Sequence, residues 1–159
     1  MLHTLAVLVE NHPGVLTRVA GLFARRAYNI DSLSVCQTED PGRSRMTIVV
    51  DGDDQIIEQV KNQLNKLVVV HSVTDLTAEN VVDRELALIR VKVGPDTRAE
   101  VLQTVDIFRG RVVDMGRTNL TVEVTGDINK IDAFVKAMKP YGLLELVRTG
   151  KIAIMRSEA

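Results

Sequence analysis

The strongest constraint on the fold of this chain of 159 residues is that one order of secondary-structure signals occurs twice. An apolar strand-like run, an amphipathic helical stretch, two strand-like runs around a turn, a second helical stretch and a last apolar run follow one another. After the polar stretch 77–83, the same order begins again. The period is about 80 residues, and a repeat of this length indicates two copies of one structural unit.

The first repeat has the order β-α-β-β-α-β. Residues 2–9 are β-branched and aliphatic and end at a polar turn, which is typical of a buried strand. From Val15 to Phe23 the apolar residues recur at helical spacing, so this stretch predicts an amphipathic helix. The other elements expected here are strands at 30–38 and 45–50 around the turn residues Pro41 and Gly42, a helix capped by Asp53 or Asp54, and a strand within 67–76.

The second repeat follows the same order. Its expected elements are a strand at 86–93, a helix opening through Pro95 and Asp96, a hairpin of 112–115 with 120–124, a helix carrying Ile131 and Phe134, and a closing strand at 143–155. We therefore predict an α+β protein of two ferredoxin-like βαββαβ domains in tandem. The expected domains are 1–76 and 84–159, with 77–83 as the linker.

Each ferredoxin-like sheet carries its helices on one face. The fourth strand is apolar at three consecutive positions, Val68, Val69 and Val70, so the other face is also expected to be apolar. An apolar sheet face is usually covered by another sheet or another chain. We therefore predict a homodimer in which sheets meet edge to edge or face to face.

Composition excludes several classes of partner and site. The formal net charge is -1, which provides no general attraction to nucleic acid or to an anionic membrane. Cys36 is the only cysteine, so neither an internal disulfide nor a CxxC pair exists, and a cytoplasmic location fits best. No apolar run reaches the roughly 18 residues expected of a membrane span.

The sequence also lacks the common motifs of catalysis and metal binding. It has no GxxxxGK[ST] loop, no GxGxxG after a strand and no HExxH helix. His3, His12 and His71 have no ligand-like spacing, and His3 and His71 are expected as ordinary polar residues of strand faces. Cys36 is expected to be a small core residue. No metal site and no catalytic residue are predicted.

Two functional classes that use comparable folds fit poorly. An RNA-recognition module needs exposed aromatic residues on its middle strands, and aromatic residues make up only 3% of this chain. An acylphosphatase-like enzyme would need an arginine in its phosphate loop, and the first arginine after this loop is Arg18.

The segment ENHPGVLTRVAGLFARRAYN, residues 10–29, carries the clearest candidate site. The first strand delivers Asn11 and His12 to the start of a helix, and Pro13 fits the first helical turn. The unpaired N–H groups and the dipole at that start attract a carboxylate, while Gly14 allows close approach. The Asn11 side chain has both an acceptor and a donor, so it could hold the ammonium and orient the carboxylate of an amino acid. Asn29 of a second chain could complete the site.

A purely structural interpretation of the same residues is also open. Asn11 and His12 could cap the helix, and Asn29 could take the left-handed conformation that often ends a helix. The residues alone do not decide between capping and ligand binding.

The segment LVENHPGVLTRVAGLFARRAYNIDSLSV resembles the start of an ACT domain, in particular that of the small regulatory subunit of acetolactate (acetohydroxyacid) synthase. The resemblance continues through DPGRSRMTIVV, LNKLVVVHSVTDL, DRELALIRVKV, IFRGRVVDMG and DAFVKAM, and so covers nearly the whole chain.

The resemblance implies that the N-terminal domain is an ACT domain that dimerises and binds a branched-chain amino acid, typically valine. The residues it assigns to the ligand are Asn11, His12, Pro13, Gly14, Val15 and Leu16, with Asn29 and Ile30 contributed across the dimer. The second repeat lacks this loop, because VGPDTR has no asparagine before it, and Gly110 and Arg111 are expected where Asn29 and Ile30 stand in the first.

The resemblance also implies that catalysis lies in a separate large subunit with thiamine diphosphate, magnesium and FAD. This chain has only the incomplete motifs GDD at Gly52 and GDI at Gly126, and no cofactor is expected in it. The small subunit would bind and activate the catalytic subunit, and valine would confer feedback inhibition. The alternative is an amino-acid-sensing ACT regulator of a different enzyme.

Overall fold

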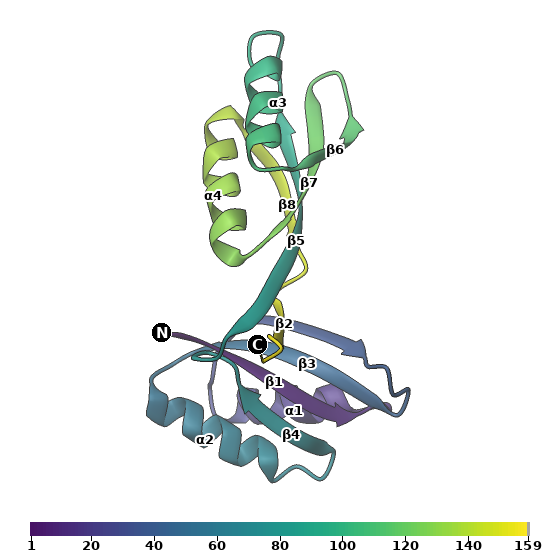
Figure 1. Cartoon of the computed structure of the whole chain (residues 1–159), viewed down its shortest axis with the longest axis vertical. Helices are drawn as coiled ribbons and strands as arrows, with labels where there is room; N and C mark the ends of the chain where they lie inside the picture. The colour runs from purple at the N-terminus through teal and green to yellow at the C-terminus, as the bar shows by residue number, and fades with distance from the viewer. Residues whose placement is uncertain (159) are drawn as a thin grey trace. The chain divides into compact units, whose positions relative to one another are not determined.

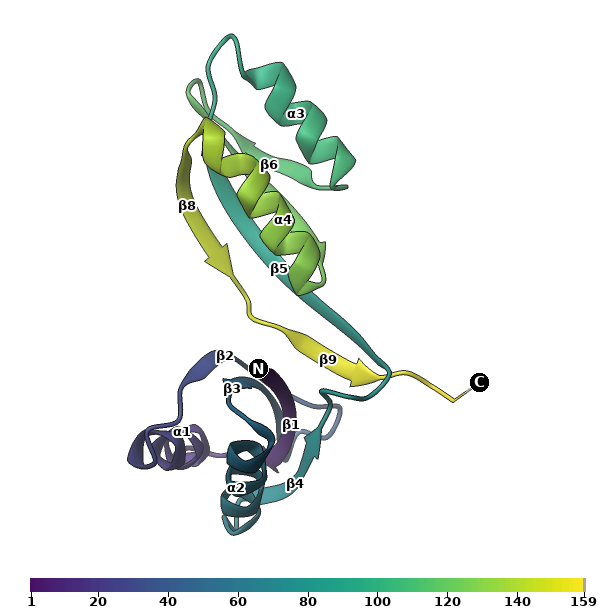
Figure 2. The same cartoon turned by 90° about the vertical axis from the view of Figure 1, so that its left-hand side faces the viewer.

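The computed structural model describes residues 1–158, and its chain divides into two compact units. The first unit contains Met1–Val82 together with the segment from Lys151 onwards, and the second contains Asp83–Gly150. Each unit has an antiparallel sheet with two α-helices on one face (Figures 1 and 2). The predicted tandem of ferredoxin-like βαββαβ folds is therefore confirmed.

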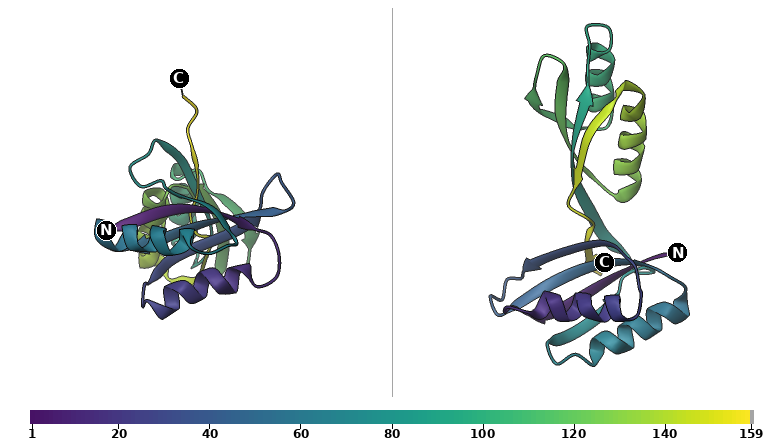
Figure 3. Two further views of the ribbon diagram at one scale, coloured as in Figure 1. Left: turned by 90° about the horizontal axis from the view of Figure 1, so that it is seen from below. Right: turned by 180° about the vertical axis from the view of Figure 1, so that it is seen from behind.

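The first unit contains the elements of the first repeat. They are β1 (Leu2–Glu10), α1 (Val15–Arg25), β2 (Ile30–Gln37), β3 (Arg43–Asp51), α2 (Asp54–Asn65) and β4 (Val70–Asp75). The strand order is β2-β3-β1-β4, so β1 lies inside the sheet. Helices α1 and α2 lie beside each other on one face, as the right-hand view of Figure 3 shows. The end of β1 is thus a fixed position next to the start of α1.

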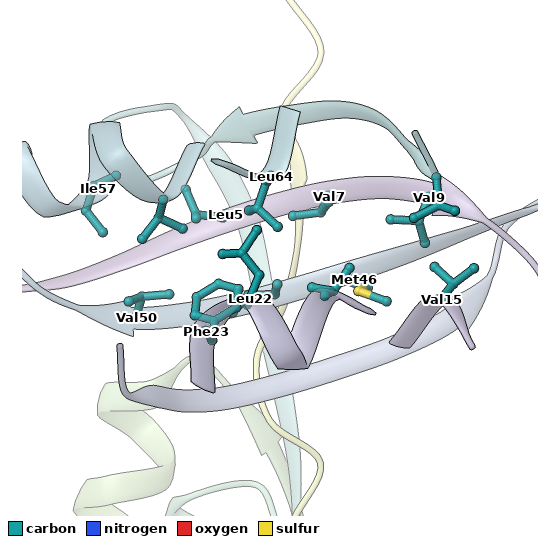
Figure 4. Packing of buried hydrophobic residues seen from close by; sticks show 14 residues of the cluster. Leu5, Val7, Val9, Val15, Leu22, Phe23, Met46, Val50, Ile57 and Leu64 are labelled. Carbon is teal, nitrogen blue, oxygen red and sulfur yellow. The ribbon is translucent and has the colours of Figure 1, made fainter. Parts of the chain in front are cut away.

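The core of the first unit follows from the alternation of side chains along β1. Leu5, Val7 and Val9 point toward the helices and are fully buried. Leu22 and Phe23 of α1 pack against them (Figure 4). Burying apolar side chains of this size contributes roughly 1.5 to 3 kcal/mol each. The helical spacing in the sequence therefore predicted most of the packed face of α1, but Leu16, expected on the same stripe, is 46% exposed.

The second unit repeats the arrangement with the strand order β6-β7-β5-β8. Its elements are β5 (Val81–Lys92), α3 (Arg98–Ile107), β6 (Arg111–Met115), β7 (Asn119–Gly126), α4 (Ile128–Met138), a short 3₁₀ helix η1 (Lys139–Tyr141) and β8 (Leu143–Arg148). Phe134 of α4 is fully buried and stacks edge-on against Phe108, with ring centroids 5.2 Å apart. The helical pattern in this part of the sequence thus marks its core.

Backbone hydrogen bonds show which residues of the two repeats correspond. The N–H of Asn11 donates to Gly42, and the N–H of Val93 donates to Thr118 at the same place after the first strand of its repeat. At the helix ends, Ala27 and Arg109 both have φ 55°. The correspondence pairs Asn29 with Arg111. The expectation that Gly110 stands at the position of Asn29 was therefore wrong by one residue.

The predicted closing strand 143–155 is in fact two strands. Strand β8 ends at Arg148, and Gly150, with φ 83°, precedes β9 (Ile152–Met155). Only glycine adopts such a φ readily, so the chain changes direction there. Strand β9 pairs with β5, whose first residue, Val81, lies in the stretch expected to be a linker. The predicted domain boundaries remain predictions. In the structure, the segment from Lys151 onwards belongs to the first compact unit.

The helix-free face of the first sheet is mixed rather than uniformly apolar. It carries Val49 beside Thr4, Ala6 and Thr47, and all four are buried. The C-terminal segment of the chain covers it: Ala153 packs against Ala6, and the Lys151 ammonium donates to the Thr4 hydroxyl at 3.1 Å. This part of the face is thus covered by the chain itself rather than by a second chain.

Val68 had suggested the apolar outer face, but it lies in the turn before β4 and is 88% exposed. Val69 belongs to the helix-covered core. The three valines therefore do not mark two faces of one strand. The homodimer itself remains a prediction.

Candidate functional site

The loop between β1 and α1 is held by the hairpin turn of the neighbouring strands. The side-chain amide of Asn11 donates to the Pro41 carbonyl at 2.9 Å, and the backbone N–H of Asn11 donates to the Gly42 carbonyl at 2.9 Å. Asn11 itself is exposed. Because the amide N–H₂ group is used by Pro41, the Asn11 side-chain oxygen remains available as an acceptor.

Gly14 ends this loop with a backbone conformation that favours glycine. Its φ is 89° and it forms the N-cap of α1. A Cβ placed on Gly14 would meet no atom of the described chain within 4 Å. The sequence-based argument relied on close approach by a ligand, and the structure adds a second reason for glycine, the left-handed backbone.

Helix α1 begins without the usual capping partner. Among the described residues, no side chain accepts a hydrogen bond from its first turn, and that turn has no acidic residue. In contrast, Asp53 caps α2 and Asp127 caps α4, each by accepting a backbone N–H. The unpaired donors and the positive end of the α1 dipole are therefore left for water or an anionic ligand.

The bonding around the first turn identifies which backbone donors are free. The Val15 N–H reaches only the His12 carbonyl at 3.4 Å, and the Arg18 N–H donates to Gly14 at 3.0 Å. Within residues 1–158, the N–H groups of Leu16 and Thr17 have no protein acceptor. These two adjacent donors form a site that a carboxylate can bind.

His12 lies beside this turn with both ring nitrogens close to oxygen atoms. Nε2 is 2.7 Å from Glu10 Oε2, and Nδ1 is 3.1 Å from the Pro13 carbonyl. The hydrogen bond to Pro13 and the one to Glu10 raise the pKa of His12, although Arg18 opposes the effect. Both hydrogen bonds therefore favour the protonated form of His12, which would place a positive charge near the start of α1.

Val15 and Leu16 contribute differently to the candidate site. The Val15 side chain is 3% exposed and belongs to the core, so only its backbone faces the loop. Leu16 is 46% exposed and is one of several large apolar side chains of this chain that face solvent. Leu16 can therefore offer an apolar contact to a ligand held at the start of α1.

Asn29 and Ile30 lie at the opposite end of α1 from Asn11. The helix has 11 residues, which corresponds to about 16 Å, so one chain cannot bring both ends to one ligand. Asn29 is exposed and Ile30 partly buried at the start of β2. The left-handed residue that ends the helix is Ala27, not Asn29 as the structural alternative proposed.

Two residues missed by the sequence-based search hold the loop, Pro41 through its backbone carbonyl and Glu10 through its carboxylate. Pro41 anchors Asn11, and Glu10 pairs with His12. The pairing of Glu10 was open to inference, because residues two apart on the end of a strand share a face. The role of Pro41 could not be inferred, because Pro41 lies in the hairpin between β2 and β3 and meets Asn11 only through the register of β1 with β3.

The remaining sequence-based candidates do not form a site. Cys36 is exposed on β2, so the expectation of a small core residue was wrong. His71 is exposed, whereas His3 is buried at the edge of the core, with Nε2 3.7 Å from Asp54 Oδ1. Over residues 1–158 no cluster of three potential metal ligands occurs. Nor does any helix in that range have the length and apolar character needed to cross a bilayer.

The chain matches two family models that together span most of its length. Residues 5–72 match the AHAS (acetohydroxyacid synthase) small subunit-like ACT domain, and residues 84–157 match the small subunit of acetolactate synthase. The two matches follow the two repeats.

Individual relatives agree with the family models. A probable acetolactate synthase small subunit of Archaeoglobus fulgidus is 55% identical over 156 residues, covering 98% of each chain. The acetolactate synthase small subunit of Mycobacterium leprae is 49% identical over 154 residues, which are 97% of this chain and 91% of the relative.

A solved structure extends the similarity to three dimensions. The crystal structure of the acetolactate synthase small subunit from Thermotoga maritima has a TM-score of 0.90 and 43% identity, over 100% of this chain and 99% of the other. With the two family models and these full-length relatives, the chain belongs to the acetolactate synthase small subunit family.

Proposed function

We propose that this chain is the regulatory small subunit of an acetolactate synthase and that it binds a branched-chain amino acid, typically valine, at residues 11–16. We call these residues the ligand loop. The observation that carries the proposal is the uncapped start of α1, where the N–H groups of Leu16 and Thr17 lack an acceptor in the described chain. A helix start left open beside a fixed asparagine supports recognition of a small zwitterion.

Each part of an amino acid has a matching group in the ligand loop. The carboxylate accepts from the free N–H groups of the first turn, where the helix dipole favours negative charge. The ammonium donates to the side-chain oxygen of Asn11, whose orientation is fixed by the bond to Pro41. The branched side chain contacts the exposed part of Leu16.

A second copy of the chain completes the proposed site. Asn29 and Ile30 are too far from Asn11 within one chain, and both are accessible at the other end of α1. In a homodimer they would close the ligand between two chains and bury its side chain. Valine would then favour one arrangement of the dimer over others.

The proposed role in the holoenzyme is allosteric. The chain binds and activates a large catalytic subunit, which carries thiamine diphosphate, magnesium and FAD, and valine shifts the complex to a less active state. Such coupling is reciprocal and typically amounts to about 1 to 3 kcal/mol. The catalytic subunit should therefore change the affinity of this chain for valine by a similar factor.

Calorimetry with valine, leucine and isoleucine tests the ligand assignment. Gly14→Asp places a carboxylate at the start of α1, where it competes for the same donors, so affinity should fall by about tenfold to a hundredfold. Asn29→Ala should weaken binding about fivefold without loss of helical circular dichroism. Equal binding by the wild type and Gly14→Asp would refute the assignment to the ligand loop.

Reconstitution tests the regulatory assignment separately. The purified chain is mixed with an acetolactate synthase catalytic subunit, and the rate is measured with and without valine. Activation by the wild type and by Gly14→Asp, with valine inhibition in the wild type alone, is the expected result. Absence of activation by either protein would count against the partnership and would favour a regulator of a different enzyme.

A further inference from the structure

The imidazole of His12 bridges two oxygen atoms that can only accept hydrogen bonds. Nε2 faces a Glu10 carboxylate oxygen at 2.7 Å, and Nδ1 faces the Pro13 backbone carbonyl at 3.1 Å. A neutral imidazole has one N–H and can donate to only one of them. Both contacts are hydrogen bonds only when both ring nitrogens carry a proton, so the observed geometry belongs to the imidazolium form.

The charges around His12 favour that form. Glu10, at the end of β1, is its acidic partner, and the bonds to Pro13 and Glu10 raise the pKa of His12 above its ordinary value of 6.5. Arg18 of α1 acts in the opposite direction. Arg43 lies opposite Glu10 in the register of β1 with β3, but its guanidinium is near Asp40, with 3.6 Å between Nε and Oδ2.

The bond to Pro13 has a consequence for the next residue. The peptide bond between Pro13 and Gly14 is trans, since no cis peptide occurs within the described chain. In a trans peptide the C=O and the following N–H point in opposite directions. When His12 holds the Pro13 carbonyl on its side, the N–H of Gly14 points to the other side. Among residues 1–158, no backbone carbonyl accepts a hydrogen bond from that N–H.

We propose that protonated His12 is a positioning residue for amino-acid binding: by holding the Pro13 carbonyl, it turns the Gly14 N–H toward the ligand carboxylate. The inference rests on the proposed ligand loop. It adds Gly14 to the free donors of the first turn and makes the direction of the Gly14 N–H depend on one proton. When His12 loses that proton, the remaining N–H stays with the charged and closer Glu10 carboxylate, so the bond to the Pro13 carbonyl is lost and the Pro13–Gly14 peptide can rotate.

The sign of the pH dependence follows from the raised pKa. The imidazolium is fully present below the ordinary His value of 6.5 and is lost as pH rises through the higher value of the folded protein. Affinity for an amino acid should therefore be greatest at mildly acidic pH and decline toward alkaline pH. Because His12 is half exposed, water screens the effect, and the expected change is only about three- to fivefold.

Valine calorimetry at about pH 6 and about pH 8.5 tests the proposal with three proteins. They are the full-length wild type, His12→Gln and His71→Gln, the last removing an exposed histidine of β4 as a matched control. The wild type and His71→Gln should bind valine about three- to fivefold more weakly at the higher pH. His12→Gln should bind with the weaker affinity at both values. The titration of valine itself is common to all three proteins and cancels in the comparison.

The outcomes separate this proposal from the proposed function. If no amino acid binds at either pH, the ligand loop itself is wrong. If valine binds but His12→Gln keeps the pH profile of the wild type, the positioning role of His12 is refuted while the site stands. As a second measurement, the Gly14 amide resonance of the wild type should follow the His12 titration in NMR spectra. A Gly14 resonance that does not move as His12 titrates would also overturn the proposal.

Discussion

The loop before α1 and the loop before α3 occupy the same position in the two copies of the fold, after the first strand of each. They differ in the side chains that they place at the start of the helix. After β1 the chain passes through Asn11 and Gly14, whereas after β5 the corresponding residues are Val93 and Asp96. Val93 is buried in the core of its unit. The second repeat thus has an apolar side chain where the first has an exposed amide.

The starts of α1 and α3 also differ in charge. Glu100 lies in the first turn of α3, and Asp96 precedes that helix, so the second repeat supplies its own negative charge to the helix dipole. The Thr97 hydroxyl also accepts the Gly94 N–H at 2.9 Å. The first repeat has none of these groups. Helix α3 also begins without a side-chain cap, so the two helix starts differ in their acidic residues and not in capping.

The two loops are also fastened to their hairpins by different residues. In the first unit the neutral amide of Asn11 donates to Pro41. In the second, the Arg98 guanidinium donates to the Gly116 and Arg117 carbonyls at 3.3 and 2.9 Å, from within the first turn of α3. The anchor of the loop thus comes from the helix itself in the second unit and from the residue after the strand in the first.

A further contrast lies at the other end of the first strands. Leu5 pairs with Asp75, and Ala87 pairs with Arg148, so these charged residues correspond. Asp75 Oδ2 is 3.8 Å from the buried His3, whereas Arg148 makes two hydrogen bonds to the buried Glu85 at 2.7 and 2.9 Å. The acid and the base have exchanged strands between the repeats.

The largest expected effect comes from breaking the stronger of these pairs. Glu85→Gln leaves the Arg148 guanidinium without its main partner, although Asp132 still accepts from it at 2.8 Å. Removing one member of a buried pair typically costs about 3 kcal/mol or more, so urea unfolding should show a loss of that size. Glu85 also raises the pKa of Arg148, in agreement with a strong pair.

Arg111→Ala is the matched control for Glu85→Gln. It removes an exposed ion pair with Glu123 at 3.2 Å in the same unit, and exposed pairs contribute at most about 1 kcal/mol. A loss from Arg111→Ala as large as that from Glu85→Gln would contradict the claim that burial makes the Arg148 pair important.

The second prediction concerns the C-terminal strand β9, whose Ala153 packs against the first sheet. Ala153 is buried against Ala6 and Leu76, so Ala153→Asp would place a carboxylate among apolar atoms and should release the segment at a cost of about 2 kcal/mol. Hydrogen exchange should report the release, because the Arg156 N–H, which donates to Asn80 at 2.9 Å, would lose protection. Ile154→Asp is the control, since Ile154 is 63% exposed and should change neither quantity.

The sequence predicted the order of the elements, because that order depends on local patterns. The apolar spacing of α1 and the turn residues between β2 and β3 act within about ten residues of each other. Asp53 was correctly named as one of two possible caps of α2. Such signals do not depend on which segments meet in space.

What the sequence did not reveal depends on long-range register. The last strand is divided at Gly150. After this division, Ala153 packs on Ala6, so residues near the two ends of the chain are in contact. No local pattern indicates such a contact. Cys36 was misplaced because β2 lies at the edge of its sheet, where alternate residues remain exposed.

The candidate site shows the same division. The sequence indicated Asn11 and Gly14 as an exposed amide and a flexible glycine before a helix, and both lie at the start of α1. It did not indicate the left-handed φ of Gly14 or the bond to Pro41, because both result from packing the loop on the hairpin. The part played by Asn29 requires a second chain and stays a prediction.

The third prediction concerns Arg98, which fastens the loop before α3 to its hairpin. Arg98→Ala removes the two hydrogen bonds to Gly116 and Arg117, and charge-assisted bonds of this kind contribute roughly 1.5 kcal/mol in total when partly exposed. Thermal unfolding should register that loss. Valine affinity should be unchanged, because α3 takes no part in the proposed site. A fall in affinity comparable with that of Gly14→Asp would mean that both repeats bind the ligand.

The smallest expected effect on stability isolates the backbone of Gly14. Gly14→Ala adds a methyl group that meets no atom of the described chain within 4 Å, so the only folding cost is the left-handed φ of 89°, about 1 kcal/mol. Gly42→Ala is the matched control: Gly42 also lies in a turn of the first unit, but its φ is not left-handed, and the added atom would be 3.4 Å from Asp40 Oδ1. Urea unfolding should separate the two variants by about 1 kcal/mol. Equal stabilities would mean that residue 14 can leave the left-handed region at no cost, and the first loop would then need glycine only for access of a ligand.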